Sequence, residues 1–298
     1  MRVFVTGATG FIGSAVVAEL VEAGHRVVGL ARSDDAAAAL AAAGFEAHRG
    51  NLDDPDSLER GAAGADGVAH LAFNHDFSTY VANGELDRRA LEALVRGLGT
   101  SEKPLVMTSV TPVLTLGRLG TEDDATDSTS PAAPRIPSED AVIAASAQGV
   151  RGSVVRLPAS VHGDGDRAFV PALMNIARET GVSAYIGDGS HRWPAVHRLD
   201  AARLFRLALE AGAPGSRYHA VADEGVRTRE IAEVIGRHLG VPVASVNSEK
   251  AAAHFGWIAG FFAMDNPTSS MLTRARLGWV PTHPGLLADL ERPGYFAS

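Results

Sequence analysis

The chain has 298 residues, of which 46% are hydrophobic and 21% charged, and its formal net charge is −8. This composition is ordinary for a globular protein, and the length allows one large core or a large and a small one. The acidic balance argues against broad nucleic-acid binding. The chain has no cysteine and therefore neither disulfides nor thiol chemistry, which is compatible with a reducing cytoplasm.

The first strand is expected to begin at Arg2, which leaves no room for a signal peptide. No apolar run reaches the roughly 18 residues that a membrane span needs. We therefore expect a cytoplasmic protein that contacts neither membranes nor nucleic acids. No histidine or carboxylate spacing is typical of a metal site. The aromatic residues near the C-terminus indicate either a small hydrophobic core or a homodimer contact.

The first thirteen residues, MRVFVTGATGFIG, predict a strand, a glycine turn and a helix. Gly7 permits the tight turn, Gly10 lets the backbone approach a ligand, and Gly13 lets the helix pack on the strand. The free N–H groups at the start of that helix suit a pyrophosphate. The function that this pattern indicates is dinucleotide binding.

The loop TGATGFIG resembles the nucleotide loop of the extended and atypical short-chain dehydrogenase/reductases, the superfamily that includes nucleotide-sugar epimerases and dehydratases. The resemblance covers nearly the whole chain. It implies a Rossmann-type, doubly wound α/β fold of six or seven mostly parallel strands. The expected dinucleotide domain is 1–160 together with 195–222, and the expected substrate-binding region is 161–194 and 223–298.

The same resemblance implies which residues contact the cofactor, with Asp53 beside the adenine, although Asp53 and Asp54 are equally well explained as helix caps. In the glycine loop they are Gly7, Thr9, Gly10, Phe11, Ile12 and Gly13. After later strands they are Arg32, Ser33, Asn51, Leu52, Asp53, Leu71, Ala72, Phe73, Thr108, Leu157, Pro158 and Ser160.

The residues after the second expected strand, His25–Leu30, predict the cofactor. An acidic residue about 20 positions beyond the glycines binds the ribose 2′-hydroxyl, whereas an arginine accommodates a 2′-phosphate. Ala31 stands where NAD-dependent relatives carry aspartate, and Arg32 follows, so NADP(H) is predicted to be preferred over NAD(H). The alternative is that Arg32 is a solvated loop charge, offset by Asp34 and Asp35.

Apolar spacing predicts the other elements. Helices are expected at 34–43, 87–98, 169–180, 201–211 and 228–239, and strands at 45–49, 68–72, 105–107, 152–158 and 218–221. Asp200 is expected to cap the helix at 201–211. The acidic and then Pro-, Ser- and Ala-rich stretch at 121–137 is typical of a long surface loop or lid.

Polar and aromatic side chains follow the fourth expected strand, at the sheet edge where open α/β sheets hold ligands. The candidates for substrate contact are therefore Asn74, His75, Asp76, Phe77 and Tyr80, and an ordinary polar loop is the alternative. Arg192 and Trp193 precede a segment that helps to bind substrate in relatives. An ordinary strand and loop would explain these two residues equally well.

In the dehydrogenases that the chain resembles, a serine or threonine at the end of the fifth strand hydrogen-bonds the reacting carbonyl. Ser109 and Thr111 are the candidates here, although such residues also simply terminate strands. His162 follows the sixth strand and is a candidate acid, because imidazole exchanges protons near neutrality. The alternative for His162 is a loop histidine bonded to backbone.

The chain departs from the resemblance at the catalytic pair Tyr-x-x-x-Lys, in which the tyrosine transfers a proton and the lysine lowers its pKa. No tyrosine and lysine of the chain have that spacing. Matched on Ser138, Arg135 takes the tyrosine position and Glu139 the lysine position, which makes Arg135 a candidate for substrate contact. Because arginine is no acid at neutral pH and glutamate lowers no neighbouring pKa, the usual relay is absent.

The sequence thus predicts an NADPH-dependent oxidoreductase that reduces a carbonyl or imine of a mid-sized, partly apolar small molecule. The proton comes from His162, Tyr80 or water, and Ser109 or Thr111 polarises the acceptor. Two alternatives stay open. A nucleotide-sugar-type epimerase or dehydratase usually depends on the missing tyrosine, whereas a non-catalytic NADP-responsive binding protein would keep the loop and lose the relay.

Overall fold

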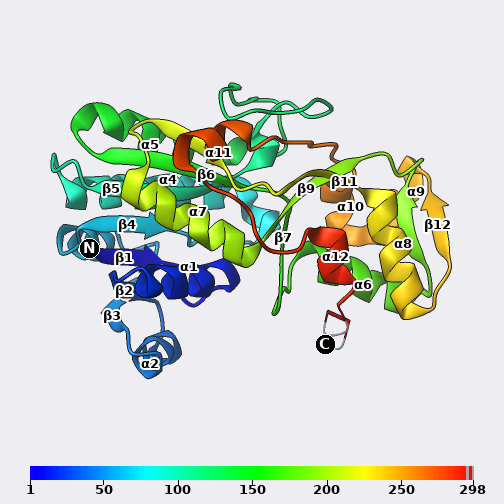
Figure 1. The fold of residues 1–298 in the computed structure, drawn as a ribbon, viewed down its shortest axis with the longest axis horizontal. Coiled ribbons are helices and arrows are strands. Elements are labelled where there is room, and N and C mark those ends of the chain that lie inside the picture. The colour runs from blue at the N-terminus through cyan, green and yellow to red at the C-terminus, as the bar shows by residue number, and fades with distance from the viewer. Residues whose placement is uncertain (293–294, 297–298) are drawn as a thin grey trace.

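The computed structural model describes residues 1–292 and 295–296. Its main body is a seven-stranded sheet in the order β10-β6-β5-β4-β1-β2-β3, in which all neighbouring strands are parallel. A smaller part at the other end of the molecule carries a three-stranded and a two-stranded sheet (Figure 1). The predicted Rossmann-type α/β fold is confirmed.

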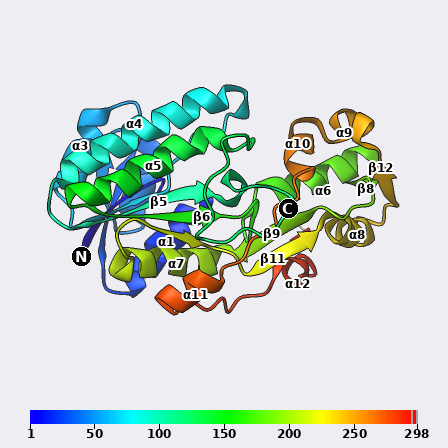
Figure 2. The ribbon, with the colours of Figure 1, turned by 90° about the horizontal axis from the view of Figure 1, so that it is seen from above.

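Helices cover both faces of the large sheet, α1 and α7 on one and α3, α4 and α5 on the other (Figure 2). The strands are β1 (Arg2–Thr6), β2 (Arg26–Ala31), β3 (Glu46–Arg49), β4 (Gly67–His70), β5 (Pro104–Val110), β6 (Arg151–Leu157) and β10 (Ser216–His219). The helices are α1 (Phe11–Glu22), α2 (Asp34–Ala42), α3 (Pro55–Ala63), α4 (Tyr80–Leu98), α5 (Ile136–Ala145), α7 (Arg198–Ala211) and α11 (Met271–Leu277).

The smaller part is built from short elements. Its strands are β7 (Ser160–His162), β9 (Arg192–His197) and β11 (Asp223–Arg227) in one sheet, and β8 (Ser183–Ile186) and β12 (Val243–Val246) in the other. Its helices are α6 (Phe169–Thr180), α8 (Thr228–Leu239), α9 (Ser248–Phe255), α10 (Ala259–Phe262) and α12 (Leu286–Leu290). The boundaries expected at 160/161 and 194/195 fall inside β7 and β9.

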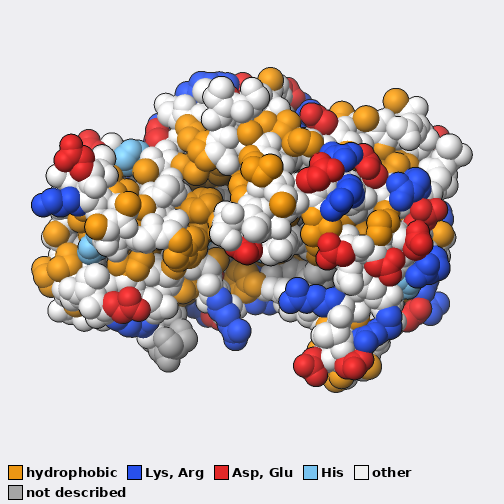
Figure 3. Space-filling view, turned by 180° about the vertical axis from the view of Figure 1, so that it is seen from behind, with side chains coloured by type: hydrophobic (Ala, Val, Ile, Leu, Met, Phe, Trp, Pro, Cys, Tyr) orange, Lys and Arg blue, Asp and Glu red, His pale blue; other side chains and the backbone are white. Residues whose placement is uncertain are grey.

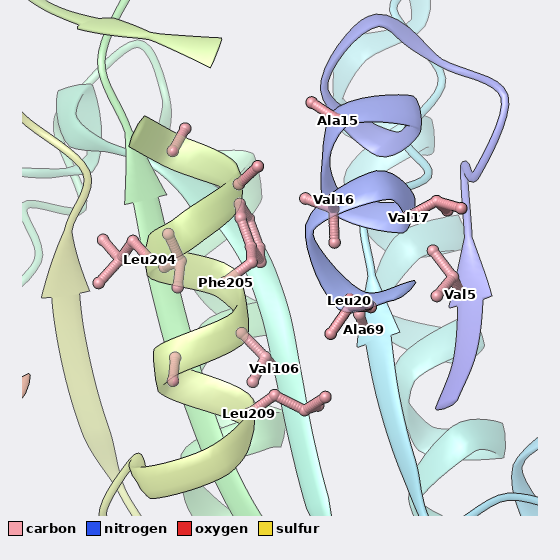
Figure 4. Close-up of a cluster of buried hydrophobic side chains, with 14 of the residues drawn as sticks. Val5, Ala15, Val16, Val17, Leu20, Ala69, Val106, Leu204, Phe205 and Leu209 are labelled. Atoms are coloured by element: carbon pink, nitrogen blue, oxygen red, sulfur yellow. The ribbon is translucent and has the colours of Figure 1, made fainter. Parts of the chain in front are cut away.

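The alternation of side chains along the strands divides the core into two layers. In β1, Val3 and Val5 join the layer under α1 and α7, whereas Phe4 joins the layer under α3 and α4. Figure 4 shows the first layer, in which Phe205 of α7 is one of the residues buried over the sheet. Because both faces are covered, the strands read as continuous apolar runs. Over the residues described, no helix is long and apolar enough to cross a membrane.

The bounds of the elements confirm most of the predicted ones, with α6 and α8 at the predicted residues. The helix predicted at 87–98 is longer, since α4 begins at Tyr80. The prediction that Asp200 caps a helix is wrong, because α7 begins at Arg198 and His197 caps it by accepting the Leu199 N–H. Asp200 instead accepts hydrogen bonds from the backbone of 282–283.

The stretch predicted as a long surface loop or lid at 121–137 is bound to the main body at several points. Glu122 is buried and accepts hydrogen bonds from the backbone and hydroxyl of Thr273, each at 2.6 Å. Ser130 is buried and donates to the carbonyl of Pro112. The stretch also contains a short helix, η3 (Ala133–Arg135), that leads directly into α5.

Candidate functional site

The glycine loop joins β1 to α1 at the carboxyl end of the sheet. Gly7 has a φ of +71°, and a Cβ on Gly13 would lie 1.9 Å from the Gly7 carbonyl oxygen, so the turn and the packing both require glycine. Gly10 is the N-cap of α1, and in the described part of the chain no side chain caps this helix. The first-turn N–H groups therefore remain available to a negatively charged ligand such as a pyrophosphate.

Two arginines lie at the ends of β2 and β3. Arg49, whose strand neighbour is Ala31, pairs with Asp34 at 2.5 Å and also donates to the Ser33 carbonyl. Arg32 is exposed, and no ion pair to it is found among residues 1–292 and 295–296. Asp34, one of the two acidic residues expected to offset Arg32, is paired with Arg49, and the role of Arg32 stays a prediction.

The other residues expected to contact the adenosine end are partly exposed and locally ordered. Asn51 accepts the Asp53 N–H at 2.7 Å, and Asp54, not Asp53, caps α3 by accepting the Ser57 N–H. Ser33 accepts the Ala36 N–H and caps α2. Asp53 is exposed beside these caps and is free for the predicted role.

A network of buried hydrogen bonds runs from β1 beneath the end of β4. The Thr6 hydroxyl accepts the N–H groups of Leu71 and Ala72, so its own proton points to Nδ1 of His70, 2.9 Å away. His70 then carries its ring proton on Nε2, which lies 3.0 Å from Oδ1 of Asp87. The network thus connects the backbone that is predicted to line the cofactor to a carboxylate on α4.

Arg135 lies at the end of this network. Its Nη1 lies 3.3 Å from Oδ2 of Asp87, and its Nη2 donates to the carbonyl of Thr108. The guanidinium carbon lies 3.9 Å from the centroid of the Phe73 ring. Arg135 is 3% exposed, so its charge is held inside the protein, between the ends of β4 and β5. Burial would raise the pKa of Asp87, but Arg135 and His70 outweigh this and keep it below its ordinary value.

Glu139, at the lysine position, is bound to arginines rather than exposed to a ligand. Both of its oxygens accept from Arg156, at 2.9 and 2.7 Å, and Arg217 lies 3.3 Å away. Burial alone would raise the pKa of Glu139, but Arg156 more than reverses this, so the pKa is lowered. Glu139 and Arg156 form a structural ion pair between α5 and β6.

The hydroxyls predicted to polarise the acceptor lie in the interior. Ser109 and Thr111 have 0% exposure, and Thr111 donates to Oδ1 of Asn266 at 2.6 Å. Thr108 and Val110 alternate with them along β5 and are the partly exposed positions. The roles of Ser109 and Thr111 stay predictions.

His162 is fully buried in β7. Its Nδ1 lies 2.8 Å from Asp289 of α12, and its ring meets the edge of His197 at 5.5 Å between centroids. Leu157, Pro158 and Ser160, expected near the nicotinamide, are also buried. His162 is thus packed within the smaller part, and its role as an acid stays a prediction.

Of the predicted substrate residues, Arg192 and Trp193 both contact the stretch 261–265. Arg192 binds Asp265 through Nε and Nη2, at 2.9 and 2.7 Å. Trp193 is fully buried and donates to the Phe261 carbonyl. Asn74 donates to Asn83 at 3.1 Å, which orders the loop after β4.

An aromatic cluster joins the two parts of the molecule. Phe77 lies in the loop after β4, and its ring centroid is 4.8 Å from that of Phe261. The Phe77 ring also stacks on Trp257, with 6.0 Å between the ring centroids and 11° between the ring planes. Phe169 of α6 packs on the same rings, at 5.0 Å from Phe261. Trp257 is 58% exposed. Figure 3 shows hydrophobic side chains gathered along the hollow between the two parts.

The aromatic cluster continues toward Arg135. The Phe77 ring lies 5.7 Å from Tyr80 and 6.2 Å from His75, and both of these rings meet Phe73 edge to face. Burial, together with the charge of Arg135, lowers the pKa of His75 below its ordinary value. The arrangement therefore offers an apolar wall with a phenol and a neutral imidazole beside a fixed positive charge.

A sequence model of the NAD dependent epimerase/dehydratase family matches residues 3–221. The chain is 54% identical over 297 residues to an uncharacterized protein of Schizosaccharomyces pombe, covering 99% of this chain and 100% of that one. It is 30% identical to the 2-alkyl-3-oxoalkanoate reductase of Stenotrophomonas maltophilia, covering 87% and 82%. The dTDP-glucose 4,6-dehydratase of Streptomyces venezuelae, solved with NAD and TYD bound, has the same fold, with a TM-score of 0.75, 21% identity and coverage of 97% and 96%.

Proposed function

The chain belongs to the NAD dependent epimerase/dehydratase family, and from this premise we propose that it is an NADPH-dependent reductase of a carbonyl or imine. Its substrate is a mid-sized, partly apolar small molecule. The protein acts in the cytoplasm, without a nucleic-acid or membrane partner. When bound, the cofactor supplies the hydride, and the protein supplies orientation, a dry site and a proton.

The residues fit a dinucleotide. The Gly7 and Gly13 positions form a cradle that a Cβ would fill, and the uncapped start of α1 offers N–H groups to the pyrophosphate. At the adenosine end, Arg32 is free to bind a 2′-phosphate because Arg49 already pairs with Asp34. This supports the preference for NADP(H).

The observation that carries the substrate class is the aromatic cluster of Phe77, Phe169, Trp257 and Phe261. Four rings at the junction of the two parts suit an apolar or aromatic substrate, because aromatic side chains gain most by burying apolar area. A relative with 30% identity is named for the reduction of a 2-alkyl-3-oxoalkanoate, a ketone that carries alkyl groups. Both observations favour reduction of an apolar ketone.

The second candidate is epimerisation or dehydration of a nucleotide sugar. The fold of the dTDP-glucose 4,6-dehydratase favours this candidate. The site counts against it, because Arg135 and Glu139 stand at the positions of the tyrosine and lysine on which such reactions usually depend.

The test is NADPH oxidation by the purified protein with a panel of 2-alkyl-3-oxoalkanoates, aryl ketones, aldehydes and cyclic imines, alongside UDP-glucose and dTDP-glucose. We expect NADPH to be consumed with members of the apolar ketone or imine group. Conversion of a nucleotide sugar without net NADPH loss would favour the epimerase. Tight NADPH binding without turnover of any compound would favour a binding protein.

A further inference from the structure

A phenol and a guanidinium meet the same ring from different elements. Arg135, at the end of η3, covers the Phe73 ring at 3.9 Å, and Tyr80, the first residue of α4, meets its edge at 6.0 Å between ring centroids. Phe73 follows β4, in the segment that the resemblance places beside the nicotinamide ribose. A tyrosine and a cation therefore flank one position at the carboxyl end of the sheet.

The cation is fixed in place. Arg135 is held by Asp87 and by the Thr108 carbonyl, and Asp87 is held in turn by His70. Moving the guanidinium away would leave the Asp87 carboxylate buried without its counter-ion, which is strongly unfavourable. The charge beside Phe73 is thus fixed in position.

The Tyr80 phenol is free to react. It is partly exposed, and no hydrogen bond to its hydroxyl is found within the described chain. Burial raises the pKa of Tyr80 above its ordinary value, the Arg135 charge acts in the opposite direction, and the Asp87 charge raises it further. Tyr80 therefore keeps its proton at neutral pH. His75, the other titratable group at this ring, is neutral there and is a poor proton donor.

We propose that Tyr80 is the proton donor of this site and that Arg135 is the fixed cation beside it. In the usual Tyr-x-x-x-Lys pair the tyrosine and the cation lie on one helix. Here the tyrosine would come from α4 and the cation from η3. Asp87 and His70 act as positioning residues. This inference rests on the proposed function and names the acid that the proposed function leaves open.

The step balances without a further reactant. When bound, the reduced cofactor would supply a hydride to the carbonyl carbon, and the Tyr80 hydroxyl would give its proton to the carbonyl oxygen, so that an alcohol would form. The tyrosinate is stabilised by the positive charge of Arg135 and is reprotonated from water. General acids placed in this way contribute about 10²–10⁴-fold in rate.

The first test needs no substrate. The tyrosines are replaced by 3-fluorotyrosine, whose lower pKa keeps the titration below alkaline unfolding, and each phenol is followed by fluorine NMR. Tyr80→Phe assigns the resonance. We expect Arg135→Met to raise the pKa of Tyr80 and Asp87→Asn to lower it, with the Tyr185 resonance unchanged in both variants. Unchanged titration of Tyr80 in both folded variants would overturn the pairing with Arg135.

The second test is catalytic. With the carbonyl panel, Tyr80→Phe should lower kcat about 10²–10⁴-fold and leave the NADPH dissociation constant unchanged. The matched control is Tyr185→Phe, which removes the same hydroxyl from β8, where the ring packs under Arg229. It should keep wild-type kcat.

The outcomes separate the two proposals. Wild-type kcat in Tyr80→Phe would overturn the acid assignment alone, and a loss confined to His162→Gln would move the acid to His162. An inactive wild-type protein on every compound would overturn the proposed function, and the acid assignment would fall with it. Retained activity in Arg135→Lys, with a larger loss in Arg135→Met, would support the role of the cation.

Discussion

At the residue scale, the two charges that the resemblance places at the positions of the usual catalytic pair are held by buried partners. Glu139 accepts hydrogen bonds from both Nε and Nη2 of Arg156, and Arg135 forms an ion pair with Asp87. Buried charges are tolerated only with such partners, because desolvation costs several kcal/mol per ion. Each arginine therefore depends on one carboxylate, and removal of that carboxylate leaves an uncompensated charge.

Glu139→Gln should lower the free energy of unfolding at pH 7 by about 3–5 kcal/mol, because Arg156 stays buried and charged. The pKa of Glu139 is lowered in the folded protein. Its contribution to the free energy of unfolding is therefore complete above the pKa of a carboxyl in the unfolded chain, about 4.3, and is lost as the pH falls through the pKa of the folded state. Urea unfolding of both proteins between pH 3 and pH 7 measures this. A difference that does not shrink at low pH would contradict it, and Glu233→Gln, in an exposed pair, is the control.

Arg32→Ala should weaken NADPH binding about ten- to a hundred-fold and leave NADH binding nearly unchanged. The reason is that a hydrogen bond to a charged group is worth roughly 1.5–3 kcal/mol, and only NADPH carries the 2′-phosphate. Fluorescence titration of both cofactors measures the ratio. An equal loss of affinity for the two cofactors would show that Arg32 does not bind the 2′-phosphate.

At the element scale, local signals predicted elements in both parts of the molecule. Apolar runs and helical spacing located the glycine loop, α6 and α8, because these features depend on neighbouring residues. The partners of Asp200 and His162 could not be predicted, since they lie 82 and 127 residues further along the chain. For the same reason the convergence of Phe77 and Trp257 has no signal in the sequence.

Gly13→Ala should abolish tight binding of both NADPH and NADH and lower the melting temperature. Its Cβ would lie 1.9 Å from the Gly7 carbonyl oxygen, so β1 and α1 must separate and the phosphate cradle must change. The control is Gly260→Ala in α10, where an added Cβ would meet nothing within 4 Å. Calorimetry of both variants with each cofactor checks this, and cofactor binding by Gly13→Ala at wild-type affinity would refute it.

At the scale of the whole molecule, a C-terminal segment returns from the smaller part to the large sheet. It runs from α10 across α11 to α12 (Figure 1). Thr111 and Asn266 join its start to the end of β5, and Asp200 binds residues 282–283 near its end. Between them Trp279 is fully buried in the layer under α1 and α7 and donates to the Asp200 carbonyl at 2.9 Å.

Trp279→Ala should lower the free energy of unfolding by about 3–5 kcal/mol, the usual effect of removing a buried tryptophan. Because this side chain ties the segment to the large sheet, the variant should also unfold in two transitions where the wild type unfolds in one. Scanning calorimetry compares the calorimetric and van 't Hoff enthalpies. One sharp transition in the variant would indicate that other contacts suffice to couple the parts.

The path of the chain has a consequence for engineering. The smaller part is assembled from stretches that leave and re-enter the sheet body after β6, β9 and β10, and its last stretch contributes Trp279 to the core of that body. It therefore cannot be cut out or exchanged as a cassette between homologues. If the proposed function holds, a change in the range of accepted compounds has to come from point substitutions in the aromatic cluster, made while the shared interior stays intact.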